Sequence, residues 1–108
     1  MAKTQINEII EIGKRYLLLL KSEDITFERV FLFGSYAKGN PKEHSDIDLA
    51  IIAPKWIPDR IDAMMMLLRL TRKIDTRIEP HPIETADFNE SNPFAYEIMK
   101  HGVEIKIN

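Results

Sequence analysis

Apolar residues recur at helical spacing in the first part of the chain. Over residues 3–22 they gather on one side of the pattern, which predicts an amphipathic helix; the apolar positions are Ile6, Ile9, Ile10, Tyr16, Leu17 and Leu20. Aromatic and branched residues then predict strands at 27–33 and 46–53. Between them we expect a short helical turn at 35–39, which Gly39 can close in a left-handed conformation, and the loop NPKEHS.

Helices and strands continue to alternate in the second half of the chain. Pro58 fits the first turn of a helix, and an apolar stripe along that helix predicts its core-facing side; the stripe consists of Ile61, Met64, Met65 and Leu68, widened by Leu67, Leu70 and Ile74. Residues 76–84 resemble a third strand, whose two prolines restrict it to a sheet edge or a bulge because proline donates no hydrogen bond. A last helix at 93–102 and a short strand at 103–107 complete the pattern.

This order of elements predicts an α/β (α+β) fold, in which a small mixed β-sheet carries helices on one face or on both. The 108 residues fit one domain spanning positions 1–108, with one core. We expect no second domain with its own substrate pocket. The substrate therefore comes to this domain or lies at an interface.

Composition excludes several classes of protein. A formal net charge of -2 argues against a general nucleic-acid binder, which needs a basic face. The chain has no cysteine, so it has no disulfide framework, no thiolate metal site and no cysteine nucleophile. We expect neither a signal peptide nor a membrane span, and therefore a cytoplasmic protein that binds neither membranes nor nucleic acid directly.

Two carboxylates interrupt the apolar strand at 46–53. Because side chains alternate along a strand, Asp46 and Asp48 point to one side, whereas Ile47 and Leu49 point into the core. Carboxylates held close together repel each other unless a cation lies between them, and Mg²⁺ is a cation that prefers such oxygen ligands. The alternative is that Asp46 caps the strand and Asp48 faces solvent.

A glycine and a serine precede this pair by a fixed distance. Gly34 and Ser35 follow the strand at 27–33, where glycine lets a phosphate approach the backbone and the serine hydroxyl can donate; Ser35 can also be a simple helix cap. Ten residues, 36–45, separate Ser35 from Asp46. Such a short connection makes the two strands neighbours, so a phosphate cradle and a metal pair would face one pocket.

The stretch GSYAKGNPKEHSDIDL resembles the signature of the nucleotidyltransferase superfamily that includes DNA polymerase beta. The small size of the chain and its C-terminal EIMKHGVEIKI are similar to those of the minimal nucleotidyltransferases of prokaryotes. These proteins are commonly encoded beside a small helical HEPN protein, as a toxin–antitoxin pair. The resemblance implies the polymerase beta-like nucleotidyltransferase fold.

The resemblance also implies roles for individual residues. Gly34 and Ser35 would bind the nucleotide phosphates, with Lys38 and Ser45 as further candidate contacts. Since two metal ions can activate the acceptor hydroxyl and neutralise the leaving pyrophosphate, two Mg²⁺ ions and ATP are the implied cofactor and nucleotide donor.

Asp46 and Asp48 would hold these Mg²⁺ ions, and Glu79 best matches the third catalytic carboxylate on a later strand. Asp75 is a second candidate for the third carboxylate, although it falls where a helix should end. His81 would share a face with Glu79, and we expect it to be an exposed edge residue rather than a functional one.

The function implied by the resemblance is that of an antitoxin enzyme. It would transfer AMP from ATP to a hydroxyl group of a partner HEPN ribonuclease, and the hydroxyl group expected is that of a tyrosine. Two alternatives stay open at this point. The chain could neutralise the toxin by binding alone, with a non-catalytic nucleotide site, or it could be a subunit of a small-molecule, aminoglycoside-type nucleotidyltransferase.

Overall fold

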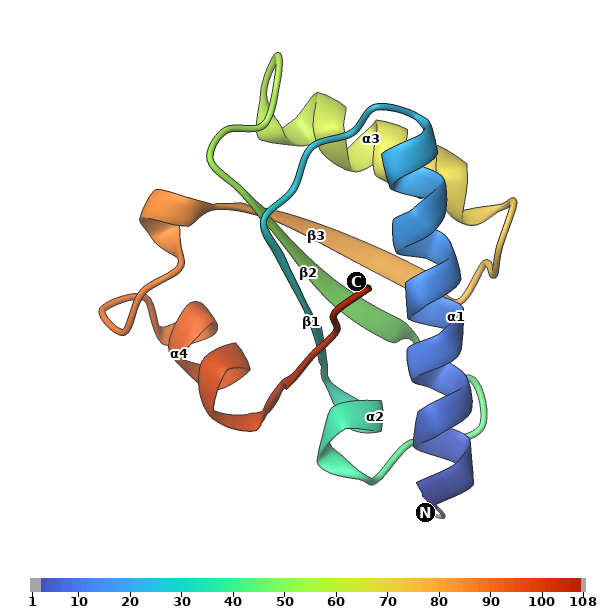
Figure 1. Ribbon diagram of the computed structural model, residues 1–108. Helices are drawn as coiled ribbons and strands as arrows, with labels where there is room; N and C mark the ends of the chain where they lie inside the picture. Colours follow the sequence, from blue (N-terminus) through green and yellow to red (C-terminus); the bar gives the residue numbers. More distant parts are fainter. Residues whose placement is uncertain (1–2, 108) are drawn as a thin grey trace.

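A computed structural model describes residues 3–107 of the chain (Figure 1). The elements alternate as the sequence predicts. The helices are α1 (Lys3–Ser22), α2 (Ser35–Lys38), α3 (Arg60–Thr71) and α4 (Pro93–His101), and a short 3-10 helix, η1, covers Thr85–Asp87. The strands are β1 (Arg29–Phe33), β2 (Ile47–Ala53), β3 (Ile78–Glu84) and β4 (Val103–Glu104).

The four strands form one mixed sheet in the order β3-β2-β1-β4. β1 is antiparallel to both β2 and β4, whereas β3 is parallel to β2. The predicted mixed sheet is therefore confirmed, and so is the prediction that the short connection through α2 makes β1 and β2 neighbours. β2 is an inner strand, which explains its nearly continuous apolar sequence.

Helices cover both faces of this sheet. α1 and α3 lie on one face, and α4 with η1 lies on the other (Figure 1). The larger core lies under α1 and α3, where the buried Tyr16 hydroxyl donates a 2.7 Å hydrogen bond to the Leu67 carbonyl and ties the two helices together. The smaller core lies under α4; its buried members are Phe31, Ala50, Ile52, Ile83 and Ile98.

The prolines of β3 lie at a free edge of the sheet, as predicted. The Ile47 N–H donates to the Arg77 carbonyl at 2.8 Å, and this bond sets the phase of the β2–β3 ladder. The N–H groups at positions 79, 81 and 83 then face β2, while positions 80 and 82 face outward. Pro80 and Pro82 therefore remove no hydrogen bond from the sheet.

The buried side of α3 differs from the prediction. Ile61 and Met65 are 74% and 58% exposed, and Leu68 is also exposed. The helix buries Ala63, Leu67 and Thr71, so the prediction for Leu67 is confirmed, and Leu70 and Ile74 pack against the same core. The small residues at 63 and 71 let the helix approach the sheet closely around Leu67, so this narrower stripe packs inward. The prediction was therefore wrong for Ile61, Met65 and Leu68 and right for the residues that widen the stripe, because apolar side chains occur on both sides of the helix.

Several element boundaries also shift. Asp59, not Pro58, marks the start of α3: its side chain accepts a 2.9 Å hydrogen bond from the Asp62 N–H and caps the helix. β1 begins two residues later than predicted, at Arg29, and β2 begins at Ile47, so Asp46 lies just before the strand. The terminal strand shrinks to the two residues of β4.

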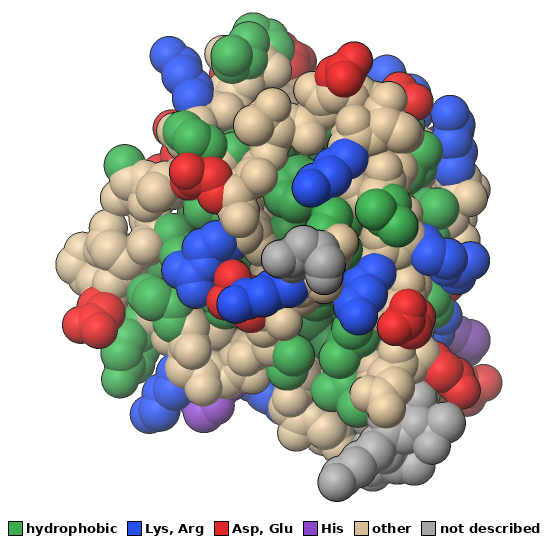
Figure 2. Space-filling view, in the orientation of Figure 1, with side chains coloured by type: hydrophobic (Ala, Val, Ile, Leu, Met, Phe, Trp, Pro, Cys, Tyr) green, Lys and Arg blue, Asp and Glu red, His purple; other side chains and the backbone are tan. Residues whose placement is uncertain are grey.

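The surface mixes charges of both signs. Lys and Arg side chains are interspersed with Asp and Glu on the face seen in Figure 2, in keeping with the small net charge. Among the helices of residues 3–107, none has the length and apolar character required to cross a membrane.

Candidate active site

The turn after β1 brings the backbone against the first residues of β2. Gly34 has φ 79° and ψ -154°, a conformation that is essentially restricted to glycine. A β-carbon at this position would overlap Oδ2 of Asp48. Gly34 is thus required both by its backbone conformation and by the carboxylate beside it.

Ser35 begins α2 immediately after this turn. Gly34 occupies the cap position, so Ser35 is the first helical residue and not the helix cap that the sequence left open. Gly39 closes α2 in the left-handed conformation with φ 79°, as predicted, and its N–H points back to the helix. The turn therefore presents the Gly34 backbone and Ser35 next to Asp48, which is the arrangement that a phosphate group bound to a metal requires.

The three predicted carboxylates converge here, with Asp46 just before β2, Asp48 on β2 and Glu79 on β3. Ile47 is fully buried, and Asp46 and Asp48 flank it at the start of β2. Asp48 is paired in register with Glu79 on the parallel neighbour β3, so these two side chains share the face that α4 partly covers. Because β2 and β3 run in the same direction, the carboxylates lie together at one end of the sheet.

The electrostatics of the cluster show an excess of negative charge. Partial burial raises the pKa of the Glu79 carboxyl, and the neighbouring carboxylates of Asp46 and Asp48 raise it further, while His81 acts in the opposite direction. Carboxylates crowded in this way repel one another, and a bound cation relieves that repulsion. The cluster is therefore suited both to cation binding and to proton acceptance.

His81 belongs to this cluster, contrary to the sequence-based expectation. Its Nε2 lies 3.3 Å from Asp48 Oδ1 and 3.9 Å from Glu79 Oε1, and its side chain is 26% exposed. The ring packs edge-on against Phe33, with 5.0 Å between centroids. The spacing of two residues from Glu79 was the available signal, because it places both side chains on one face of β3.

The ligand atoms fit a divalent cation. One ligand atom from each of Asp48, Glu79 and His81 lies within 4.8 Å of the others. The oxygen donors that Mg²⁺ prefers come from Asp48 and Glu79, with Asp46 adjacent. Mg²⁺ leaves part of its coordination shell to water and phosphate oxygens, so an incomplete protein shell beside the Gly34 turn suits a metal-bound nucleotide.

Asp75, the alternative third carboxylate, has a different partner. Its carboxylate accepts hydrogen bonds from Arg77 Nε at 3.1 Å and Nη2 at 2.9 Å. These bonds hold the pKa of Asp75 below its ordinary value. Asp75, just before β3, is therefore paired with Arg77. Glu79 is the carboxylate that reaches Asp48.

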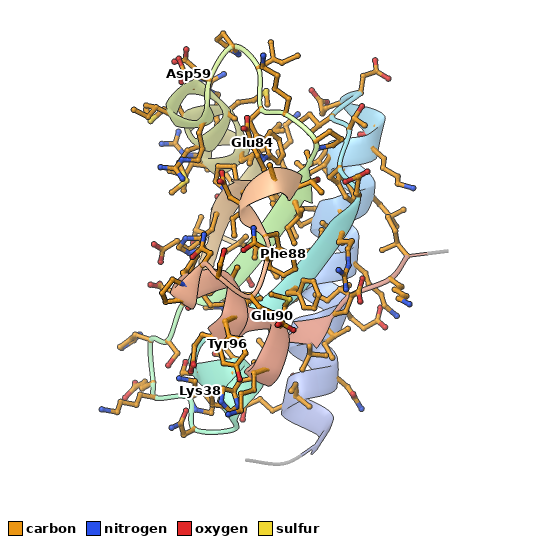
Figure 3. The ribbon with its side chains drawn as sticks, turned by 90° about the vertical axis from the view of Figure 1, so that its left-hand side faces the viewer. Lys38, Asp59, Glu84, Phe88, Glu90 and Tyr96 are labelled. Carbon is orange, nitrogen blue, oxygen red and sulfur yellow. The ribbon has the colours of Figure 1, made fainter. Side chains whose placement is uncertain are left out.

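Lys38 and Ser45 lie in the segment that connects β1 to β2, and each has a partner outside the cluster. Lys38 Nζ is 3.8 Å from Glu97 Oε1 on α4, at the foot of that helix (Figure 3), and it lines a hollow of about 210 Å³ together with Gly34 and Phe94. We call this the smaller hollow. The Ser45 hydroxyl accepts a 2.7 Å hydrogen bond from the Lys42 N–H and so closes the loop. Nucleotide contacts from Lys38 and Ser45 stay predictions.

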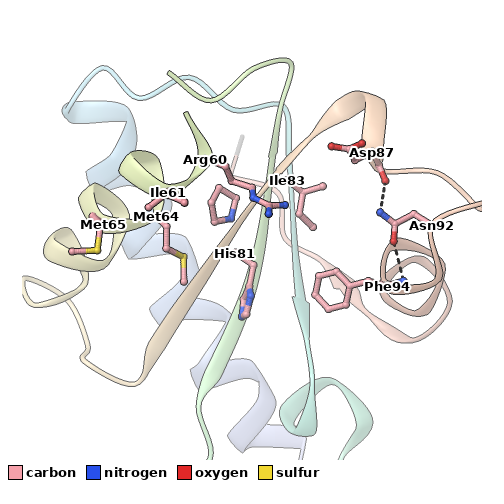
Figure 4. Close-up of a pocket in the computed structure, with 10 residues that line it drawn as sticks. Arg60, Ile61, Met64, Met65, His81, Ile83, Asp87, Asn92 and Phe94 are labelled. Carbon is pink, nitrogen blue, oxygen red and sulfur yellow. Dashed lines mark hydrogen bonds between the residues drawn. The ribbon is translucent and has the colours of Figure 1, made fainter. Parts of the chain in front are cut away.

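A larger hollow, of about 570 Å³, lies beyond His81 between α3 and α4 (Figure 4). Met64 and Met65 reach it from α3, His81 and Ile83 from β3, and Phe94 from α4. No sequence pattern predicted this hollow, because its walls come from α3, β3 and α4, which are far apart along the chain. His81 links it directly to the carboxylates.

Comparison with known proteins agrees with this geometry. Residues 7–108 match the family described as polymerase beta nucleotidyltransferase. A provisionally named protein adenylyltransferase of Methanocaldococcus jannaschii is 32% identical over 108 residues, which cover 91% of this chain and 99% of that protein. The match therefore extends over nearly the whole length of both proteins.

Solved structures share the fold. A provisionally assigned nucleotidyltransferase from Sulfolobus solfataricus superposes with a TM-score of 0.64 at 19% identity, over 92% of this chain and 80% of that one. A toxin–antitoxin structure with AMP-PNP gives a TM-score of 0.62 at 21% identity, over 88% and 73%. The chain thus belongs to the polymerase beta nucleotidyltransferase family, as its Gly-Ser and Asp-x-Asp motif predicts.

Proposed function

We propose that the chain is a Mg²⁺-dependent antitoxin enzyme, which transfers AMP from ATP to a tyrosine hydroxyl of a partner HEPN ribonuclease. The observation that carries this proposal is the contact between Gly34 and Asp48. It joins the turn expected to receive phosphates to the carboxylates expected to hold metal. A nucleoside triphosphate bound between the Gly34 turn and these carboxylates would have its α-phosphate beside Glu79.

The residues divide the reaction between them. Asp46, Asp48 and Glu79 would hold Mg²⁺, which supplies positive charge to the α-phosphate and to the departing pyrophosphate. Glu79 would accept the proton of the attacking hydroxyl, a role suited to a carboxyl with a raised pKa. An oxygen–phosphorus bond forms to the acceptor as the bond to pyrophosphate breaks. Gly34 and Ser35 would hold the pyrophosphate end in line.

The choice of donor and acceptor rests on relatives. The Methanocaldococcus jannaschii protein carries the name of a protein adenylyltransferase. Similar solved structures include a toxin–antitoxin complex with AMP-PNP, an ATP analogue, and MntA-HpeT toxin–antitoxin complexes. These findings support ATP as donor and a toxin as acceptor. The HEPN identity of the partner and its tyrosine, and a cytoplasmic location, rest on the resemblance seen in the sequence.

The test uses the product of the adjacent gene as acceptor. The purified chain is mixed with this protein, Mg²⁺ and ATP labelled at the α-phosphate, and the label on the acceptor is counted after electrophoresis. We expect label on the acceptor, none when EDTA replaces Mg²⁺, and none with Asp48→Asn. Asp62→Asn, an exposed aspartate on α3, is the matched control and should transfer label as the wild type does.

Two results would contradict the proposal. One is an unlabelled acceptor although the wild-type chain binds Mg²⁺ and ATP. The other is a double variant, Asp46→Asn with Asp48→Asn, that neutralises the toxin in cells as well as the wild type does. The second result would favour an antitoxin that acts by binding alone.

A further inference from the structure

We propose that the larger hollow holds the purine base of the donor nucleotide, and that Phe94 provides the ring on which the base stacks. This inference rests on the proposed function, because it takes a nucleoside triphosphate as the donor. It adds a binding site for the base to the phosphate and metal sites, and it assigns that site to α3, β3 and α4.

Phe94 is an exposed aromatic residue in a fixed position. Its side chain is 47% exposed, although it lies on a helix that buries Ala95 and Ile98 in the core. The Asn92 side chain caps α4 by accepting a 3.0 Å hydrogen bond from the Phe94 N–H. The ring makes a T-shaped contact with Phe33, with 5.4 Å between the centroids and 85° between the planes. In a T-shaped pair each ring keeps at least one face free of its partner, and such a face is available for stacking.

Phe94 lies where the nucleobase of a bound nucleotide would be expected. Phe94 lines both hollows: the smaller one, which contains Gly34 and Lys38, and the larger one, which contains His81. Phosphates beside Gly34 would place the α-phosphate at Asp48, and His81 Nε2 is 3.3 Å from Asp48 Oδ1. The nucleoside therefore leaves the metal cluster next to His81, at the entrance of the larger hollow.

The walls of the larger hollow also suit a flat aromatic ligand. Its volume of about 570 Å³ lies within the range of about 300 to 1,000 Å³ that is typical of small-molecule sites. Met64 and Ile83 supply apolar walls facing Phe94 across the hollow (Figure 4). Thioether and aliphatic groups pack well against aromatic faces.

Arg60 and Asn92 are two polar side chains that line the larger hollow. Arg60 reaches the hollow from the start of α3 and forms no ion pair within residues 3–107, so its guanidinium is available to a π-system. Asn92 is occupied, because its oxygen caps α4 and its Nδ2 donates to the Asp87 carbonyl. We therefore infer recognition by stacking, which accepts any base and favours two-ring purines modestly, through their larger stacking area.

The experiment separates the base from the phosphates. Calorimetric titration measures the binding of Mg·ATP, Mg·UTP and Mg·tripolyphosphate, which lacks a base, to the full chain. We expect Phe94→Ala to weaken Mg·ATP binding about tenfold, in line with the loss of one base–aromatic stack, and to leave tripolyphosphate binding unchanged. Phe94→Trp should retain ATP affinity. The wild type should prefer ATP to UTP, and Phe94→Ala should lose that preference.

Tyr96→Ala is the matched control. Tyr96 lies on the same helix and is 45% exposed, but it lines neither hollow. The Tyr96→Ala variant should bind all three ligands as the wild type does. Circular dichroism of both alanine variants checks that α4 is retained.

The outcomes distinguish this inference from the proposed function. Unchanged ATP affinity in Phe94→Ala overturns the base site alone, and so does an equal loss of ATP and tripolyphosphate, which would show that Phe94 supports the phosphate turn. Failure of the wild type to bind Mg·ATP overturns both proposals. A wild type that binds ATP through Phe94 but transfers no label to the acceptor overturns only the proposed function.

Discussion

Gly34 and Asp48 touch: the space that a β-carbon would need at position 34 is filled by the Asp48 carboxylate. Gly34 directly follows β1, Asp48 lies on the neighbouring strand β2, and the two residues are fourteen positions apart in the chain. Their contact explains why the motif needs glycine at one end and an aspartate at a fixed distance. Any side chain at 34 would displace the carboxylate that is expected to hold metal.

Gly34→Ala tests this contact. We expect the variant to lose Mg·ATP binding, because the added methyl group moves Asp48 and the backbone conformation disfavours alanine. Gly39→Ala is the matched control: Gly39 also has φ 79°, but nothing lies within 4 Å of a β-carbon there. The control should lose about 1 kcal/mol of stability and keep nucleotide binding. Equal nucleotide affinity in the two variants would show that the contact is unimportant.

The identity of the third carboxylate is tested by a pair of substitutions. Glu79→Gln should lower the rate of label transfer at least about 100-fold, because it removes a metal ligand and the proton acceptor. Asp75→Asn should change the rate by less than about threefold, since Asp75 is bound to Arg77 and does not face the cluster. Single-turnover label transfer measures both. A larger loss with Asp75→Asn would reverse the assignment.

The Asp75–Arg77 pair predicts a pH dependence of stability. Hydrogen bonds from Arg77 lower the pKa of Asp75 in the folded state, so the pair stabilises the fold above the ordinary carboxyl pKa. This contribution is lost as the pH falls through the lowered folded pKa. Asp75→Asn should reduce the free energy of unfolding by about 1 kcal/mol at neutral pH, with the difference shrinking below about pH 4. Urea denaturation at several pH values measures it; a constant difference would exclude the pair as its source.

The packing of α3 is tested by two adjacent leucines. Leu67 is fully buried, whereas Leu68 is 37% exposed. Leu67→Ala should lower the free energy of unfolding by about 2 to 5 kcal/mol, because it leaves a cavity under the helix. Leu68→Ala should lower it by less than about 1 kcal/mol. The reverse order, in chemical denaturation, would mean that the side of α3 with Ile61, Met65 and Leu68 faces the core instead.

Local patterns predicted most of the fold. The α1 stripe, the apolar β2 strand and the prolines of β3 each have one physical reading, so their elements and the edge position of β3 were confirmed. α3 has apolar residues on both sides, and its buried side depends on how closely Ala63 and Thr71 approach the sheet. Such tertiary packing is not encoded in a helical period.

In the candidate site, too, some residues could be predicted from local sequence and others could not. Gly34, Ser35, Asp46 and Asp48 are close in the chain and carry a recognisable spacing, so they could be predicted together. His81 and Phe94 could not be assigned, because their place in the site depends on the register of β3 against β2 and on the packing of α4. The hollow is also lined by residues of α3, which precede His81 by more than ten positions; these are Arg60, Ile61, Met64 and Met65.

The most direct test of the account is whether Mg²⁺ controls ATP binding through Asp48. Calorimetry compares ATP binding with Mg²⁺ and with EDTA for the wild type, Asp48→Asn and the surface control Asp62→Asn. We predict that Mg²⁺ tightens ATP binding at least about tenfold in the wild type and in Asp62→Asn, and that this effect is absent in Asp48→Asn. An equal Mg²⁺ effect in Asp48→Asn would contradict a metal-bound triphosphate between the Gly34 turn and the carboxylates.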